Sequence, residues 1–119
     1  MTLEQLAGEL DIDLGEVLDR LVNNRALMIR LLKAFATDTT DIRRAQKALD
    51  AEDYRAVAES LHSMKGGAVS LGLHNIEMLC ADVIQAVCTG RLTEVSVLLD
   101  RLQREYTRTS QLVIREDIQ

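Results

Sequence analysis

The sequence predicts an all-α domain, an antiparallel up-down four-helix bundle with an N-terminal helical cap. Proline is absent from the 119 residues, so no residue forces a helix to break. Only 3% of the residues are aromatic. Apolar residues make up 47% of the chain and recur at intervals of three and four, the spacing of one helix face. The links between these periodic segments are short, which places consecutive helices antiparallel. The length fits a single domain, residues 1–119, with one core.

Two helical segments are expected in the N-terminal half. The first covers residues 3–21 and is interrupted where Asp11-Ile12-Asp13 offers turn and capping oxygens. The second covers residues 25–49. Its middle, Thr37-Asp38-Thr39-Thr40, is poor in helix formers. Because the apolar stripe keeps its phase across this weak stretch, we expect one long helix.

Three further helical segments are expected in the C-terminal half, over residues 53–71, 75–89 and 93–112 or beyond. Gly72 and Gly90 directly follow the first two of these, at the position where glycine commonly ends a helix.

Composition excludes several classes of function. The net charge is −5 and no basic run occurs, which argues against binding to nucleic acid or to anionic membranes. No apolar segment is long enough to span a bilayer, and the N-terminus lacks the pattern of a signal peptide. Cys80 and Cys88 fall near one apolar helix face, so we expect both to be small buried residues rather than a disulfide. We therefore expect a cytoplasmic protein.

The third predicted helix carries an unusual combination of residues. His62 stands about 100° around the helix from Leu61 of the core stripe, so its side chain is expected at the surface. Gly66 and Gly67 are consecutive in the helix interior, where each costs about 1 kcal/mol relative to alanine. Gly66 lies on the face of His62 and is expected to clear space around the imidazole. Gly67 points elsewhere and is expected to allow a close helix contact.

This combination suits phosphoryl transfer. An imidazole is mostly neutral at pH 7 and is a competent nucleophile. Lys65, three positions after His62, can neutralise phosphoryl oxygens as a point charge. The small residues Ala58 and Gly66 leave room for a partner, and no base-orienter triad for acyl transfer is recognisable. The competing interpretation is an ordinary solvated histidine on a helix surface.

The segment from His62 to Gly72 resembles the signature of histidine-containing phosphotransfer (HPt) domains. That signature is a histidine, any residue, an apolar residue, lysine and glycine, with an apolar-glycine pair closing the helix. The matching residues are His62, Met64, Lys65, Gly66 and the pair Leu71-Gly72. The resemblance implies a helical bundle with the active histidine exposed midway along one helix. It also implies a phosphorelay intermediate, a carrier without its own ATP site rather than an enzyme.

The resemblance also implies partners. His62 would accept a phosphoryl group from a receiver-domain aspartate and pass it to another receiver. The expected partners are response-regulator receiver domains and a hybrid sensor kinase, and the chain itself is expected to be a monomer. No cofactor or metal site is expected here, because Mg²⁺ is expected on the receiver. The partner surface should surround His62, as an apolar patch with a charged rim formed by Arg55, Ala58, Glu59, Lys65, Gly66 and Val69.

Two other functions compete with this interpretation. One is a docking module that binds a kinase or receiver without transferring phosphate, although such a module has no need of His62 and its glycine clearance. The other is the dimerisation and phosphoacceptor domain of a sensor kinase, which exposes an apolar helix hairpin; here four helices are expected to close their own core. A zinc site built from His62, His74, Cys80 and Cys88 matches no known ligand spacing.

Overall fold

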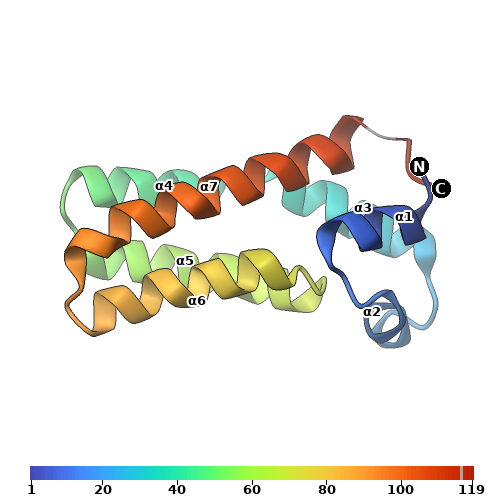
Figure 1. Cartoon of the computed structure of the whole chain (residues 1–119). Helices are drawn as coiled ribbons and strands as arrows, with labels where there is room; N and C mark the ends of the chain where they lie inside the picture. The colour runs from blue at the N-terminus through green and yellow to red at the C-terminus, as the bar shows by residue number, and fades with distance from the viewer. Residues whose placement is uncertain (116) are drawn as a thin grey trace.

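The computed structural model of the chain consists of helices joined by short turns (Figure 1). It describes residues 1–115 and 117–119. The helices in chain order are α1 (Leu3–Leu10), α2 (Leu14–Arg20), α3 (Arg25–Thr37), α4 (Thr40–Asp50), α5 (Tyr54–Ser70), α6 (His74–Cys88) and α7 (Leu92–Arg115). The all-helical class predicted from the apolar spacing is confirmed.

The four helices α4 to α7 lie side by side and run in alternating directions along one end of the molecule (Figure 1). Helix α5 packs against both α4 and α6, and α6 packs against α7. At the other end, α1 and α3 pack against α7, and α2 lies below α1 in this view (Figure 1). The two chain ends pair there, because Leu3 N donates to Gln119 O and Gln119 N donates to Met1 O, at 3.0 and 3.1 Å. Within the described residues no helix is both long and apolar enough to cross a bilayer.

The predicted interruption between the first two helices is present. Asp11 adopts a left-handed backbone with φ of 55° and ends α1. Asp13 then caps α2, because its Oδ1 accepts a hydrogen bond from Glu16 N at 3.2 Å. Short polar residues tolerate both roles, which is why two aspartates two positions apart stop one helix and start another.

The expectation of one long helix over residues 25–49 is wrong. Helix α3 ends at Thr37, and α4 begins at Thr40. Between them Asp38 has an extended backbone, and its Oδ1 accepts a hydrogen bond from Thr40 N at 3.1 Å. The aspartate side chain thus offers the backbone an alternative to the helical hydrogen bond, as short polar residues commonly do.

A tyrosine from a distant helix occupies the break. The hydroxyl of Tyr106 on α7 lies 2.8 Å from Phe35 O, 3.2 Å from Ala36 O and 3.1 Å from Asp38 O. The last carbonyls of a helix have no partner within it, and the hydroxyl is placed to donate its one hydrogen to any one of these three oxygens. The rings of Phe35 and Tyr106 also meet edge to face, with centroids 5.8 Å apart. Helix α7 therefore stabilises the end of α3.

The two cysteines differ, contrary to the expectation that both are buried. Cys80 is fully buried, and burial raises the pKa of its thiol to about 12. Cys88 is exposed at the last position of α6. Eight residues correspond to 800° of helix rotation, so the second cysteine lies 80° further around than the first and leaves the core face.

We predict that Tyr106→Phe lowers the free energy of unfolding by about 1–2 kcal/mol, because the carbonyls at the end of α3 lose a donor in a buried setting. Urea unfolding followed by circular dichroism measures this loss. Tyr54→Phe is the matched control, because Tyr54 is half-buried and its hydroxyl bonds to none of the described residues. Equal losses in the two variants would contradict a special role for the Tyr106 hydroxyl.

Candidate functional site

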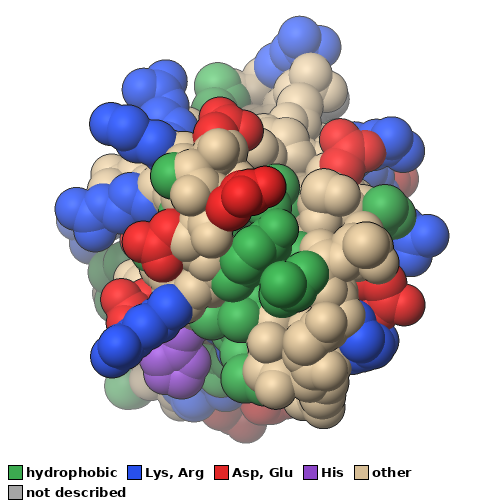
Figure 2. Space-filling view, turned by 90° about the vertical axis from the view of Figure 1, so that its left-hand side faces the viewer, with side chains coloured by type: hydrophobic (Ala, Val, Ile, Leu, Met, Phe, Trp, Pro, Cys, Tyr) green, Lys and Arg blue, Asp and Glu red, His purple; other side chains and the backbone are tan. Residues whose placement is uncertain are grey.

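Helix α5 presents one face to the core and the opposite face to solvent. Asp53 starts it, because its Oδ1 accepts a hydrogen bond from Ala56 N at 3.1 Å. The buried stripe consists of Val57, Leu61, Met64 and Ala68. His62 lies off this stripe and is exposed, as the 100° offset from Leu61 predicts. Figure 2 shows a histidine side chain at the surface, next to a basic side chain.

The side chains of His62 and Lys65 are unengaged. Within residues 1–115 and 117–119, neither forms a side-chain hydrogen bond or an ion pair. Lys65 is half-buried and lies one turn after His62 on α5. An imidazole and an ammonium group that are free of internal partners are both available to an anionic group brought from outside.

The two consecutive glycines of α5 have different surroundings. Apart from its chain neighbours and the backbone of its own helix, a Cβ placed on Gly66 would meet no described atom within 4 Å. A Cβ placed on Gly67 would lie 3.3 Å from two ring carbons of Phe35. Gly67 therefore lies against the Phe35 side chain of α3, rather than against the backbone of a neighbouring helix. None of the described residues crowds position 66, and Gly66 is exposed one turn after His62.

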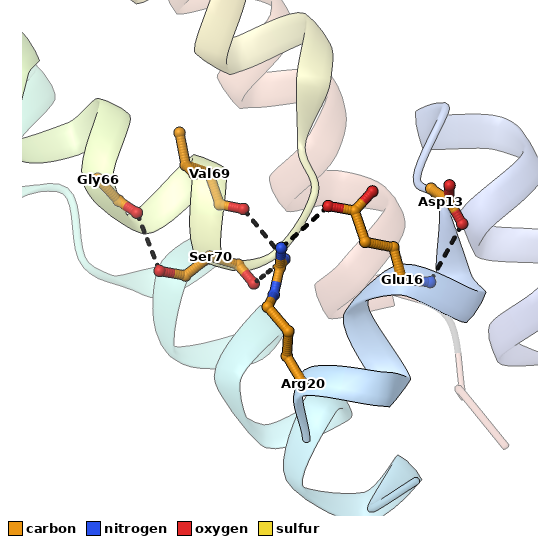
Figure 3. A network of polar contacts seen from close by, with 6 residues as sticks. All are labelled: Asp13, Glu16, Arg20, Gly66, Val69 and Ser70. Carbon is orange, nitrogen blue, oxygen red and sulfur yellow. Dashed lines mark hydrogen bonds and ion pairs between the residues drawn. The ribbon is translucent and has the colours of Figure 1, made fainter. Parts of the chain in front are cut away.

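The C-terminal end of α5 is held by α2 (Figure 3). Nη2 of Arg20 donates to Ser70 O at 2.9 Å and to Val69 O at 3.3 Å, and Nη1 donates to Glu16 at 3.1 Å. These carbonyls belong to the last turn of the helix, where a cation is favourable. Sequence reasoning missed Arg20, because its spacing from Glu16 has the pattern of an ordinary surface ion pair.

Glycine closes the same end. Gly72 has φ of +67°, and a Cβ there would lie 2.8 Å from a methyl carbon of Val17 on α2. Both the left-handed backbone and the contact with α2 exclude larger residues. The glycine after α5 was predicted as a helix stop, and in the structure it is also where α2 packs.

The residues predicted to contact a partner lie along the outer side of α5. Arg55 and Glu59 form an ion pair with 3.1 Å between Nε and Oε1, and both are well exposed, so the pair adds little stability. Ala58 is half-buried, and Val69 is 44% exposed. Helical spacing places Ala58 one turn before His62 and Val69 two turns after it. An exposed apolar residue thus lies on the face of the histidine.

The remaining histidine and the cysteines do not join this group. His74 is half-buried at the first position of α6. Among residues 1–115 and 117–119 there is no cluster of three or more histidine, cysteine, aspartate or glutamate residues suited to a metal ion.

The structure thus places an exposed histidine and a neighbouring lysine on one helix of an all-helical domain. In the comparison with family models, the model described as Hpt domain matches residues 28–112. This match covers most of the chain and runs from α3 into α7. The chain belongs to the histidine-containing phosphotransfer domain family, whose members serve two-component phosphorelays. No curated protein and no solved structure matches the chain.

We predict opposite outcomes for alanine at the two glycines. Gly66→Ala should raise the free energy of unfolding by about 1 kcal/mol, because alanine favours the helix and the new methyl group enters open space. Gly67→Ala should give no such gain, because its methyl group would press on the Phe35 ring. Chemical denaturation of both variants measures the difference. An equal gain at both positions would mean that the Phe35 contact imposes no restriction.

Proposed function

We propose that His62 accepts a phosphoryl group from the aspartate of one receiver domain and passes it to the aspartate of another. The observation that carries this proposal is the exposed, unpartnered imidazole of His62 within the stretch that matches the Hpt family model. Lys65 and Gly66, one turn further along the same face of α5, support it.

The proposed step is a direct displacement at phosphorus. A lone pair of the His62 imidazole forms the nitrogen–phosphorus bond while the bond from phosphorus to the aspartyl oxygen breaks. The aspartate leaves as a carboxylate, and the reverse step delivers the group to the next receiver. Such transfers depend on positioning and on neutralisation of the phosphoryl oxygens, because the transition state spreads negative charge over them. Mg²⁺ held by the receiver and Lys65 of this chain would share that neutralisation.

Gly66 has a steric role in this proposal. Its surface is open in the isolated chain, so a larger side chain there is excluded by nothing in the fold. A receiver that brings its aspartate to His62 must approach within bonding distance, and a side chain one turn away would stand in its path. Glycine at this position therefore suits the approach of a second protein.

The proposed docking surface surrounds His62 on α5. Val69 supplies exposed apolar area, Ala58 allows close approach, and Arg55 and Glu59 supply a charged rim. This composition suits a transient complex, which needs a modest apolar centre and a polar edge. The partners would be response-regulator receiver domains and a hybrid sensor kinase.

The arrangement of the helices also bears on the oligomeric state of the chain. We infer an up-down four-helix bundle in which α3 and α4 together occupy one helix position and α1 with α2 form the cap. The buried faces of these helices pack against one another, so the bundle closes its own core, which supports a monomeric carrier. We also propose that the carrier lacks its own ATP site and acts in the cytoplasm, as the family resemblance implies. The alternatives are a docking module and a dimerising kinase fragment. A docking module would bind receivers without becoming labelled, and a kinase fragment would sediment as an obligate dimer.

We predict that His62→Gln abolishes phosphorylation by a prephosphorylated receiver domain while the fold is retained, because the position is exposed. The measurement is transfer of radiolabel from the receiver, with circular dichroism of both proteins as the control for folding. Acid-labile, base-stable label on the wild type alone is the expected result. Equal labelling of the variant, or no labelling of a well-folded wild type by a panel of receivers, would count against the proposal.

We predict that Val69→Asp slows transfer about tenfold, because a charge would replace the apolar centre of the docking surface; such a loss equals about 1.4 kcal/mol. Val97→Asp is the matched control, since Val97 is 52% exposed on α7, away from α5. Initial transfer rates at low receiver concentration measure the effect. The docking surface would be misplaced if both variants transferred at the wild-type rate.

A further inference from the structure

A groove lies beside α5 on the side turned toward α3 and α4. Its volume is about 330 Å³, within the range of small-molecule sites. Apolar side chains form most of its lining, and among them are Phe35 and Tyr106, two of the three aromatic residues of the chain. We call it the Phe35 groove.

Two features described above create this groove. Glycine at position 67 leaves space next to the Phe35 ring, which a Cβ would approach to 3.3 Å. The break between α3 and α4 adds polar groups to an otherwise apolar lining, because Asp38 lies in the break and Asp41 in the first turn of α4. An apolar body with a few polar groups on one side is the usual composition of a ligand site.

The charged side chains among the described lining residues of the Phe35 groove are both acidic. Asp38 and Asp41 contribute carboxylates, and no lysine, arginine or histidine is found among its described lining residues. Neither aspartate is paired with a cation in the described part of the chain. Hydrogen bonds from Thr40 hold the pKa of Asp38 below its ordinary value, and the positive charge of Arg44, which is not among the lining residues, lowers it further.

A second groove provides a contrast within the same molecule. It lies between α7 and the α3–α4 break, has a volume of about 490 Å³, and is lined by Arg43 and Arg115 with no acidic residue among its described lining. Tyr106 and Ile42 border both grooves. The acidic character of the Phe35 groove is therefore a local property and does not follow only from the net charge of the chain.

We propose that the Phe35 groove binds a small organic cation with an apolar, ring-sized body. The ammonium or guanidinium group would face Asp38 and Asp41, and the body would contact Phe35, Met64 and the open backbone at Gly67. Carboxylates supply the charge complementarity, and an aromatic ring adds attraction for a cation that approaches its face. This site is independent of the proposed phosphotransfer, although Ser63 and Gly67 in its lining directly follow His62 and Gly66 in the chain.

The test is a titration of the isotope-labelled protein followed by backbone amide chemical shifts. The probes are phenethylammonium, the neutral 2-phenylethanol and the anionic 3-phenylpropionate, which share one ring and differ in charge. We expect saturable shifts at Phe35, Asp41 and Gly67 with the cation, with a Kd of roughly 1–10 mM for a probe of this size. Binding of the neutral and anionic probes at the same amides should be at least about tenfold weaker.

Two variants separate a specific carboxylate effect from general charge. Asp41→Asn should weaken phenethylammonium binding roughly fivefold, as expected for loss of one partly exposed ion pair. Asp50→Asn, at the last position of the same helix and outside the groove, should leave binding unchanged. Equal affinity for the three probes, an equal loss in both variants, or no saturation by about 50 mM cation would overturn the proposal. These outcomes are independent of whether His62 is phosphorylated.

Discussion

The rotation of α5 about its own axis is the constraint on which the rest of the structure depends. Val57, Leu61, Met64 and Ala68 are all buried between neighbouring helices, and their burial fixes which residues of α5 face outward. Turning the helix by a single residue, about 100°, would expose part of this stripe. Exposing a large apolar side chain costs roughly 1.5–3 kcal/mol, so the stripe firmly sets the direction of His62. The packing of the inner face of α5 thus determines which residues are available on its outer face.

Much of this arrangement could be predicted from the sequence, because its signals are local. Apolar residues at intervals of three and four located α5, and Gly72 marked its C-terminal end. The break after Thr37 could not be predicted in this way. The Tyr106 hydroxyl, which stabilises the break, lies about seventy positions away in the chain. The periodic spacing of apolar residues carries no information about such a distant contact. In this break a local contact, from Thr40 N to the Asp38 side chain, acts together with the distant Tyr106 hydroxyl.

In the candidate site, too, local features were predictable from the sequence, whereas contacts between distant segments were not. His62, Lys65 and Gly66 were proposed from their spacing and from the family signature, and helical spacing also separated Gly66 from Gly67. The neighbour of Gly67, the Phe35 ring of α3, could be identified only from the structure. Arg20 could not be identified at all, because a surface pair with Glu16 and a clamp on the end of α5 have the same local pattern. The structure therefore adds mainly contacts between segments that are far apart in the chain.

The unengaged state of His62 and Lys65 has a kinetic consequence. Within the described residues no internal hydrogen bond or ion pair must be released before either group meets a phosphoryl oxygen. For the proposed carrier, loading and unloading then need no rearrangement of its own side chains. The supply of phosphorylated donor and of free acceptor would then set the net direction of phosphoryl transfer. The chain itself would impose no direction on the transfer.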